Sequence, residues 1–203
     1  EQVREIVNSG IDDLLIKPLS TSALLNRVNT LVSERKPFVV TFDYIGPDRR
    51  KSIDRETNIP HFDVPNTLAA KATGEGVESI HIFIRKMTLE INEQKLDRHV
   101  RQFHWLANAL IDEFTSHGAS ETFAGHLDRL AFVAQDTARR VERTSRDHIS
   151  KLCKSVLGLN VRICKNSNSP NASISIPRDL AVVTRMAAAI QAGFATDVEA
   201  TAR

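Results

Sequence analysis

The stretch Gly10–Ser20, GIDDLLIKPLS, decides how the first part of the chain is read. Its centre, from Leu14 to Ile16, is a continuous apolar run, which is typical of a strand buried on both faces of a parallel sheet, and Pro18 ends it. A strand needs neighbours to pair with, and nothing before it in this sequence could supply a sheet. We therefore expect that the sheet lies outside this sequence and that the chain, which starts with Glu1 rather than Met, is the C-terminal part of a larger protein.

Helical patterns flank this expected strand on both sides. Apolar residues at helical spacing over residues 1–9 predict a first helix, and Gly10 follows it, where helix ends commonly carry glycine. Ser20 and Thr21 are N-cap candidates for a second helix that reaches about residue 35. Its apolar stripe consists of Leu24, Leu25, Val28, Leu31 and Val32. Residues 1–35 therefore predict helix, strand and helix, a truncated piece of an alternating α/β fold.

Residues 36–76 differ in composition from what precedes them. They contain four of the seven prolines and show no sustained helical period. We expect an extended linker that includes the motif YIGPDRRK (44–51), in which Gly46 and Pro47 set a turn. A short helix is expected near TLAAKATG (67–74).

The pattern from residue 77 to residue 203 is helical almost throughout. Residues 77–117 predict one long helix or two, ended by Gly118. Further helices are expected over about 120–143, 145–163 and from Pro177, a residue favoured in first turns, to about 196. This region therefore predicts an antiparallel helical bundle, and the chain as a whole is expected to be mainly α.

Composition excludes several classes of protein. Cys153 and Cys164 are the only cysteines, too few for a disulfide framework, and no CxxC pair suggests a metal site. The formal net charge of +2 does not imply nucleic-acid binding. No apolar run is long enough to span a bilayer and no signal peptide is evident, so we expect a cytoplasmic location and no membrane partner.

The first 35 residues resemble the last third of a response-regulator receiver domain. In that family a Gly-Ala-Asp-Asp turn, an apolar strand, Lys-Pro and a capped helix follow one another. Gly10, Asp12, Asp13, Lys17 and Pro18 match this order, and Ile11 replaces the usual small residue. The resemblance implies that Lys17 contacts a phosphorylated aspartate, that the Lys17–Pro18 bond is cis, and that a sensor histidine kinase or a phosphotransfer protein is the partner of the intact receiver.

The remaining parts of a receiver site have no counterpart in this sequence. The acidic pair, the acceptor aspartate and the Ser or Thr of the family would all precede residue 1. Asp12 and Asp13 cannot replace them, because they lie at the other end of the strand from Lys17. We therefore expect no cofactor in this fragment, with Mg²⁺ needed only by the intact receiver.

The linker motif supplies the candidate interaction residues. PFVVTFDYIGPDRRK (37–51) is similar to a tail that follows receiver domains in some alphaproteobacterial regulators, where a helical region comes next. Its candidate residues are Tyr44, Gly46, Pro47, Asp48, Arg49 and Arg50. The two arginines could pin the linker to acidic residues of the first 35 residues or of the bundle, or they could bind a phosphate or a partner carboxylate.

Two further hypotheses concern the bundle. His148 and Lys151 have the spacing found in histidine phosphotransfer domains, although Leu152 stands where that family has Gly; the alternative is a surface histidine beside Asp147. His126 has a weaker version of the pattern. Residues 139–154 are basic and could form a nucleic-acid surface, or simply the solvated side of a helix, since they lack aromatic residues.

These observations favour a regulatory role without catalysis. No nucleotide-binding, nucleophile or metalloprotease motif is present, so we expect no catalytic residue. The sequence predicts a non-enzymatic phosphorelay regulator with a helical output or dimerisation region, which could form a homodimer. The alternatives are phosphotransfer at His148 and a nucleic-acid-binding output through residues 139–154.

Overall fold

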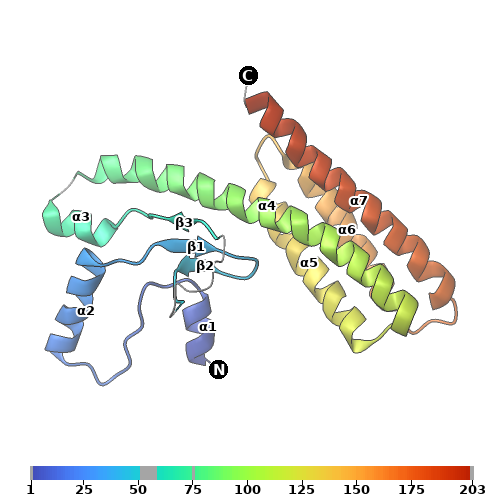
Figure 1. The fold of residues 1–203 in the computed structure, drawn as a ribbon, viewed down its shortest axis with the longest axis horizontal. Coiled ribbons are helices and arrows are strands. Elements are labelled where there is room, and N and C mark those ends of the chain that lie inside the picture. Colours follow the sequence, from blue (N-terminus) through green and yellow to red (C-terminus); the bar gives the residue numbers. More distant parts are fainter. Residues whose placement is uncertain (1, 51–58, 75, 202–203) are drawn as a thin grey trace. The chain divides into compact units, whose positions relative to one another are not determined.

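The computed structural model describes residues 2–50, 59–74 and 76–201 of the chain. The protein is mainly helical, with a small antiparallel sheet (Figure 1). It divides into two compact units, Glu1–Lys95 and Leu96–Arg203, and this division falls inside helix α4 (Val77–His117). The boundary expected at residue 77 therefore lies within the first unit. Among the described residues, no helix combines the length and the apolar character needed to cross a bilayer.

The two helices expected in the first 35 residues are present. They are α1 (Gln2–Asn8) and α2 (Thr21–Ser33). Ser20 is the N-cap of α2, and its hydroxyl accepts a hydrogen bond from the backbone N–H of Ala23 at 3.1 Å. Gly10 has a φ of 84°, in the left-handed region where glycine carries no steric penalty.

The strand expected between these helices is not formed. Leu14 to Ile16 carry no strand assignment, and no described segment pairs with them. The physical reason is that a β-strand forms only when its backbone is hydrogen-bonded to a neighbouring strand, and this apolar run has no such neighbour among the described residues. The Lys17–Pro18 peptide bond is cis, as the resemblance implied.

Residues 36–76 were expected to be an extended linker with a short helix near 67–74, but their described part also contains a small sheet. The sheet has the order β2-β1-β3, with β1 (Phe38–Val40) antiparallel to both β2 (Ile45–Pro47) and β3 (His61–Phe62). Burial of the Val39 and Val40 side chains stabilises this sheet. Helix α3 (Thr67–Thr73) follows, where the sequence predicted it.

The turn expected at Gly46 and Pro47 lies elsewhere. Both residues belong to strand β2, which is an edge strand and so tolerates proline. The chain reverses between Thr41 and Tyr44, where the Thr41 N–H donates to the Tyr44 carbonyl at 2.8 Å and the Thr41 hydroxyl accepts from the Tyr44 N–H at 3.0 Å. The hydroxyl of Thr41 therefore fixes the turn that glycine and proline were expected to make.

Residues 77–117, for which the sequence predicted one long helix or two, form the single continuous helix α4. Of its residues before Lys95 whose burial is described, none is buried. Lys95 is only 4% exposed, and its Nζ donates to the carbonyl oxygens of Thr41, at 3.0 Å, and Phe42. The ammonium group thus binds the β1–β2 turn to α4 within the first unit.

Replacement of Lys95 should release this turn. We expect Lys95→Met to destabilise the first unit by about 1–2 kcal/mol, because two carbonyl oxygens lose a charged donor in a buried setting. Hydrogen exchange at Val40 and Ile45 should accelerate correspondingly. Lys86→Met, a change at an exposed lysine on the same helix, is the control and should leave exchange unchanged. Equal exchange in both variants would show that Lys95 does not hold the turn.

The second unit packs four helices around one core: the remainder of α4, α5 (Glu121–Val141), α6 (Asp147–Asn166) and α7 (Ala172–Thr201). Gly118, with a φ of 68°, follows the end of α4 as predicted, and Ser120 caps α5 through the N–H of Phe123. The largest fully buried side chains in this core include Phe103, Leu106, Leu110, Phe123, Leu130 and Ile163.

Two expected helix boundaries in this unit were wrong. Helix α5 ends at Val141, and Arg143 has a φ of 62°, so Arg139, Arg143 and Arg146 do not share the face of one helix. Helix α7 begins at residue 172, and Pro177 lies inside it rather than at its start. The side chain of Ile176 is fully buried, and this burial stabilises the turns of α7 that precede Pro177.

The two cysteines should differ sharply in reactivity. Cys153 is fully buried, and burial raises its pKa to about 12, so only about one thiol in 10⁴ is ionised at pH 8. Cys164 is exposed, although burial of its sulfur and the charge of Asp128 raise its pKa as well. Alkylation of the folded protein, followed by mass spectrometry, should modify Cys164 alone, and unfolding in urea should release both. Equal rates in the folded state would contradict this prediction.

Candidate functional site

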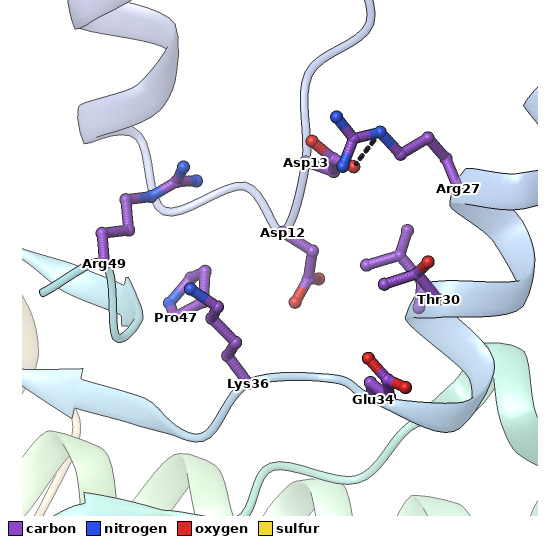
Figure 2. A pocket seen from close by; sticks show the side chains of 9 residues that line it. Asp12, Asp13, Arg27, Thr30, Glu34, Lys36, Pro47 and Arg49 are labelled. Carbon is purple, nitrogen blue, oxygen red and sulfur yellow. Dashed lines mark ion pairs between the residues drawn. The ribbon is translucent and has the colours of Figure 1, made fainter. Parts of the chain in front are cut away.

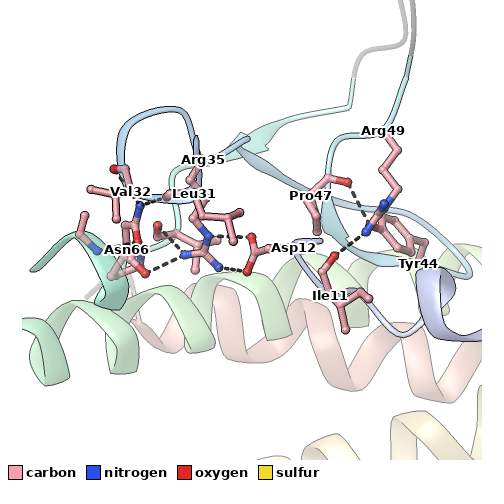
Figure 3. Close-up of polar contacts among 12 residues, drawn as sticks. Ile11, Asp12, Leu31, Val32, Arg35, Tyr44, Pro47, Arg49 and Asn66 are labelled. Carbon is pink, nitrogen blue, oxygen red and sulfur yellow. Dashed lines mark hydrogen bonds and ion pairs between the residues drawn. The ribbon is translucent and has the colours of Figure 1, made fainter. Parts of the chain in front are cut away.

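The contacts that join residues 10–35 to residues 36–66 form the candidate functional site, which we call the junction. Its first component is Arg35, which follows α2. The guanidinium Nε and Nη2 donate to both carboxylate oxygens of Asp12, at 2.7 and 2.9 Å, and Nη1 donates to the carbonyl of Pro65 at 2.8 Å (Figure 3). The same group lies 5.0 Å from the centre of the Phe38 ring. One side chain therefore ties together the Asp12 turn, the start of β1 and the segment before α3.

The second component is Arg49 of the DRRK motif. Its Nη2 donates to the carbonyl oxygen of Ile11, and its Nε donates to the hydroxyl of Tyr44 at 3.2 Å (Figure 3). That hydroxyl donates in turn to the carbonyl of Pro47 at 3.0 Å. Arg49 thus reaches the first 35 residues as the pinning interpretation predicted, but it binds a backbone carbonyl rather than an acidic side chain.

Two glycines allow the backbones to meet at the junction. A Cβ added at Gly10 would lie 2.2 Å from the carbonyl oxygen of Ile45, and one added at Gly46 would lie 2.7 Å from the Cα of Gly10. Neither distance is possible for a real side chain, so both positions need glycine. Close backbone approach, rather than a turn, is therefore the role of Gly46.

Asn66 closes the junction on the side of α3. Its side-chain oxygen accepts from the N–H of Ala69 at 3.0 Å and caps α3, while its Nδ2 donates to the carbonyl of Leu31, near the end of α2, at 2.7 Å (Figure 3). The Asn66 amide therefore hydrogen-bonds a backbone N–H at the start of α3 and a backbone carbonyl near the end of α2.

A polar pocket of about 210 Å³ opens at the junction. Its charged lining residues are Asp12, Asp13, Arg27, Glu34, Lys36 and Arg49 (Figure 2). Arg27 pairs with Asp13 at 3.3 Å. Lining charges of both signs largely balance one another, so the pocket favours no anion or cation by charge alone.

Asp48 and Arg50 of the same motif make a local contact. Arg50 donates to both oxygens of Asp48, and the Nε2 of His61 lies 2.8 Å from Oδ2. The hydrogen bond from Arg50 holds the pKa of Asp48 well below its usual range, with a smaller contribution from His61. The carboxylate therefore links β2 to β3, and this part of the motif serves the sheet.

The structure places Lys17 away from these contacts. Lys17 and Pro18 are exposed and follow the extended Leu14–Ile16 stretch, whose other end carries Asp12. Lys17 makes no hydrogen bond or ion pair with any described residue. The junction and Lys17 thus occupy opposite ends of one short segment.

His148 and Lys151 are both exposed in the first turn of α6. A Cβ added at Gly193 of α7 would lie 3.2 Å from the His148 Nε2, so α7 passes close to the imidazole at a residue without a side chain. Nearby, the Arg146 guanidinium lies 5.0 Å from the ring of Phe194.

At least three of the six arginines and lysines in the basic stretch 139–154 form ion pairs. Arg139 and Arg140 both donate to Asp136, at 2.6 and 2.8 Å, and Lys154 lies 3.7 Å from Glu142. These arginines serve a carboxylate of their own helix, which weakens the argument for a nucleic-acid surface.

A buried charged cluster was missed by the sequence analysis. His99 is fully buried, and its Nε2 lies 2.8 Å from the Asp136 Oδ2. Burial by itself raises the pKa of Asp136, but the hydrogen bonds from His99, Arg139 and Arg140 together hold it well below its usual range. The spacing of three and four residues between Asp136 and the two arginines predicts ion pairs along one helix. The contact with His99, 37 residues away, leaves no pattern in the local sequence.

Comparison with known proteins adds no relative to these observations. A scan against protein-family models and searches of curated proteins and of solved structures found no match to this chain.

Proposed function

We propose that the chain is a non-enzymatic component of phosphorelay signalling, in which Lys17 contacts the phosphoryl group of a receiver site completed by residues outside 1–203. The observation that carries this proposal is the order within residues 10–33. An Asp12–Asp13 turn, an extended apolar run, the exposed Lys17, Pro18 and a Ser20-capped helix follow one another. A lysine in this order would supply a point charge suited to a phosphoryl oxygen.

The junction supports a route by which such a signal would leave the site. Lys17 and Asp12 belong to the same short segment, and Arg35 and Arg49 bind the far end of it to the sheet and to the segment before α3. A shift of this segment on phosphorylation would change those contacts directly. The upstream partner in this proposal is a sensor histidine kinase or a phosphotransfer protein, with Mg²⁺ at the receiver site.

The test uses the protein expressed from its complete gene. It is incubated with Mg²⁺ and a small radiolabelled phosphodonor, and hydrogen exchange is then compared between the labelled and the unlabelled form. We expect an aspartyl-phosphate label and accelerated hydrogen exchange around Arg35 and Arg49. Lys17→Ala should keep the fold but abolish the exchange response, whereas Lys71→Ala, an exposed lysine on α3, should not. Absence of label, or an unchanged response in Lys17→Ala, would refute the proposal.

Phosphotransfer at His148 is a second candidate, favoured by the exposed imidazole beside Gly193. In this reaction a phosphoryl group passes from a donor aspartyl phosphate to an imidazole nitrogen, and the donor recovers its carboxylate. Transfer to the full chain should give an acid-labile, alkali-stable label that is lost in His148→Ala and kept in His81→Ala. Equal labelling of the two variants would exclude His148.

A further inference from the structure

A pocket of the second unit lies between α6 and α7. It has a volume of about 660 Å³, within the range of ligand-binding pockets. Its lining includes Arg162, Asn166, Asn171, Ile174, Arg178 and Val182, which we call the α6–α7 pocket. The lining combines two cationic side chains, the carboxylate of Asp179, and amide, hydroxyl and aliphatic side chains, and it contains no aromatic ring.

At the end of α6 and the start of α7, where the pocket lies, cationic side chains outnumber acidic ones. Residues 162–182 contain three cationic side chains, Arg162, Lys165 and Arg178, and one acidic side chain, Asp179, whereas α6 and α7 in full carry six cationic and four acidic side chains. Asp179 is buried and bound to Arg162. The exposed charge that residues 162–182 contribute beside the α6–α7 pocket is therefore positive, which complements an acidic partner.

Arg162 is held in place before any partner arrives. Its Nε donates to the Asp179 Oδ2 at 2.8 Å and its Nη2 donates to Oδ1, while 55% of its side chain stays exposed. Asp179 also raises the pKa of Arg162. A guanidinium fixed on one edge and open on the other loses little conformational entropy when it binds a carboxylate.

Arg178 supplies the uncommitted charge. It is exposed, and it makes no ion pair or hydrogen bond with any residue that the structure describes. Beside these arginines Ile174 is 76% exposed, an unusual exposure for a large aliphatic side chain, and Val182 is half-buried. Cationic groups thus flank an uncovered aliphatic surface.

We propose that the α6–α7 pocket binds an acidic protein segment that carries an aliphatic residue among its carboxylates. The carboxylates would bind Arg178 and the open edge of Arg162, and the aliphatic side chain would pack on Ile174 and Val182. Single-stranded nucleic acid fits less well, because its bases need aromatic side chains to stack on. The inference does not depend on the phosphoryl site at Lys17.

The test measures fluorescence anisotropy with the full chain and three labelled peptides of matched length. One repeats Glu-Glu-Leu-Ala, the second replaces Glu with Gln, and the third replaces Leu with Ser. The first should bind with a dissociation constant of about 10–100 μM, and either replacement should weaken binding by at least about tenfold. A labelled DNA duplex is the fourth probe.

Variants assign the binding to the pocket. Arg178→Glu and Ile174→Ser, both at exposed positions, should each weaken binding of the first peptide by about tenfold while Trp105 fluorescence shows the fold intact. Arg101→Glu makes the same charge change on α4 and should have little effect. Equal loss in Arg101→Glu and Arg178→Glu, tighter binding of DNA than of the peptide, or no saturable peptide binding would each overturn the proposal.

Discussion

Replacement of Asp136 by alanine should destabilise the second unit by about 3–5 kcal/mol, because it leaves two charged or polar partners without their buried acceptor. His99 is fully buried and Arg140 is partly buried, and both bind the Asp136 Oδ2 at 2.8 Å. Water cannot replace the lost acceptor for a side chain with no exposed surface. Urea unfolding followed by the fluorescence of Trp105, the single tryptophan, measures the change.

The matched control for this prediction is Asp128→Ala. Asp128 is an exposed carboxylate on the same helix, so its removal should change stability by less than about 0.5 kcal/mol. A second variant, His99→Leu in the Asp136→Ala background, removes the stranded imidazole and should recover part of the loss. Similar midpoints for Asp136→Ala and Asp128→Ala would show that the buried cluster does not stabilise the unit.

Gly10→Ala should unfold the junction, with a loss of at least about 3 kcal/mol in the first unit. The new Cβ would lie 2.2 Å from the backbone oxygen of Ile45, and no side-chain rotation can relieve a contact with backbone. Residue 10 also has a φ of 84°, which costs any residue with a side chain. Tyr44, the single tyrosine, lies at the junction, and its fluorescence therefore reports this unfolding.

Gly74→Ala separates the two parts of that cost. Gly74 has a φ of 76° but nothing within 4 Å of an added Cβ, so alanine there should cost only about 1 kcal/mol. The difference between the two variants therefore isolates the backbone contact between Gly10 and Ile45. Equal losses in Gly10→Ala and Gly74→Ala would mean that the junction does not depend on this close approach.

Features encoded within a few residues were read correctly from the sequence. Ser20 caps α2, Gly118 follows the end of α4, and TLAAKATG forms α3. Capping and helical periodicity act between residues three or four apart, so the sequence carries them without reference to the rest of the fold.

The wrong predictions concern features that depend on residues far apart in the sequence. Leu14 to Ile16 read as a strand, but a strand needs a partner and no described segment supplies one. Gly46 and Pro47 read as a turn, but pairing with β1 and contact with Gly10 make them part of a strand. Pro177 read as a helix start, but the burial of Ile176 extends α7 to residue 172. In each case the presence or the absence of a distant partner, rather than the local preference, decided the structure.

The candidate site divides in the same way. The sequence by itself determined a mainly helical chain and its principal helices, and it named Arg49 as a residue that could pin residues 36–76 to the first 35. Only the tertiary structure decided that Arg35 binds Asp12, that Lys95 binds the turn at Thr41, and that His99 binds Asp136, across 23, 54 and 37 residues. A buried charge is stable only where the fold brings it a partner, and local patterning does not reveal which partner that is.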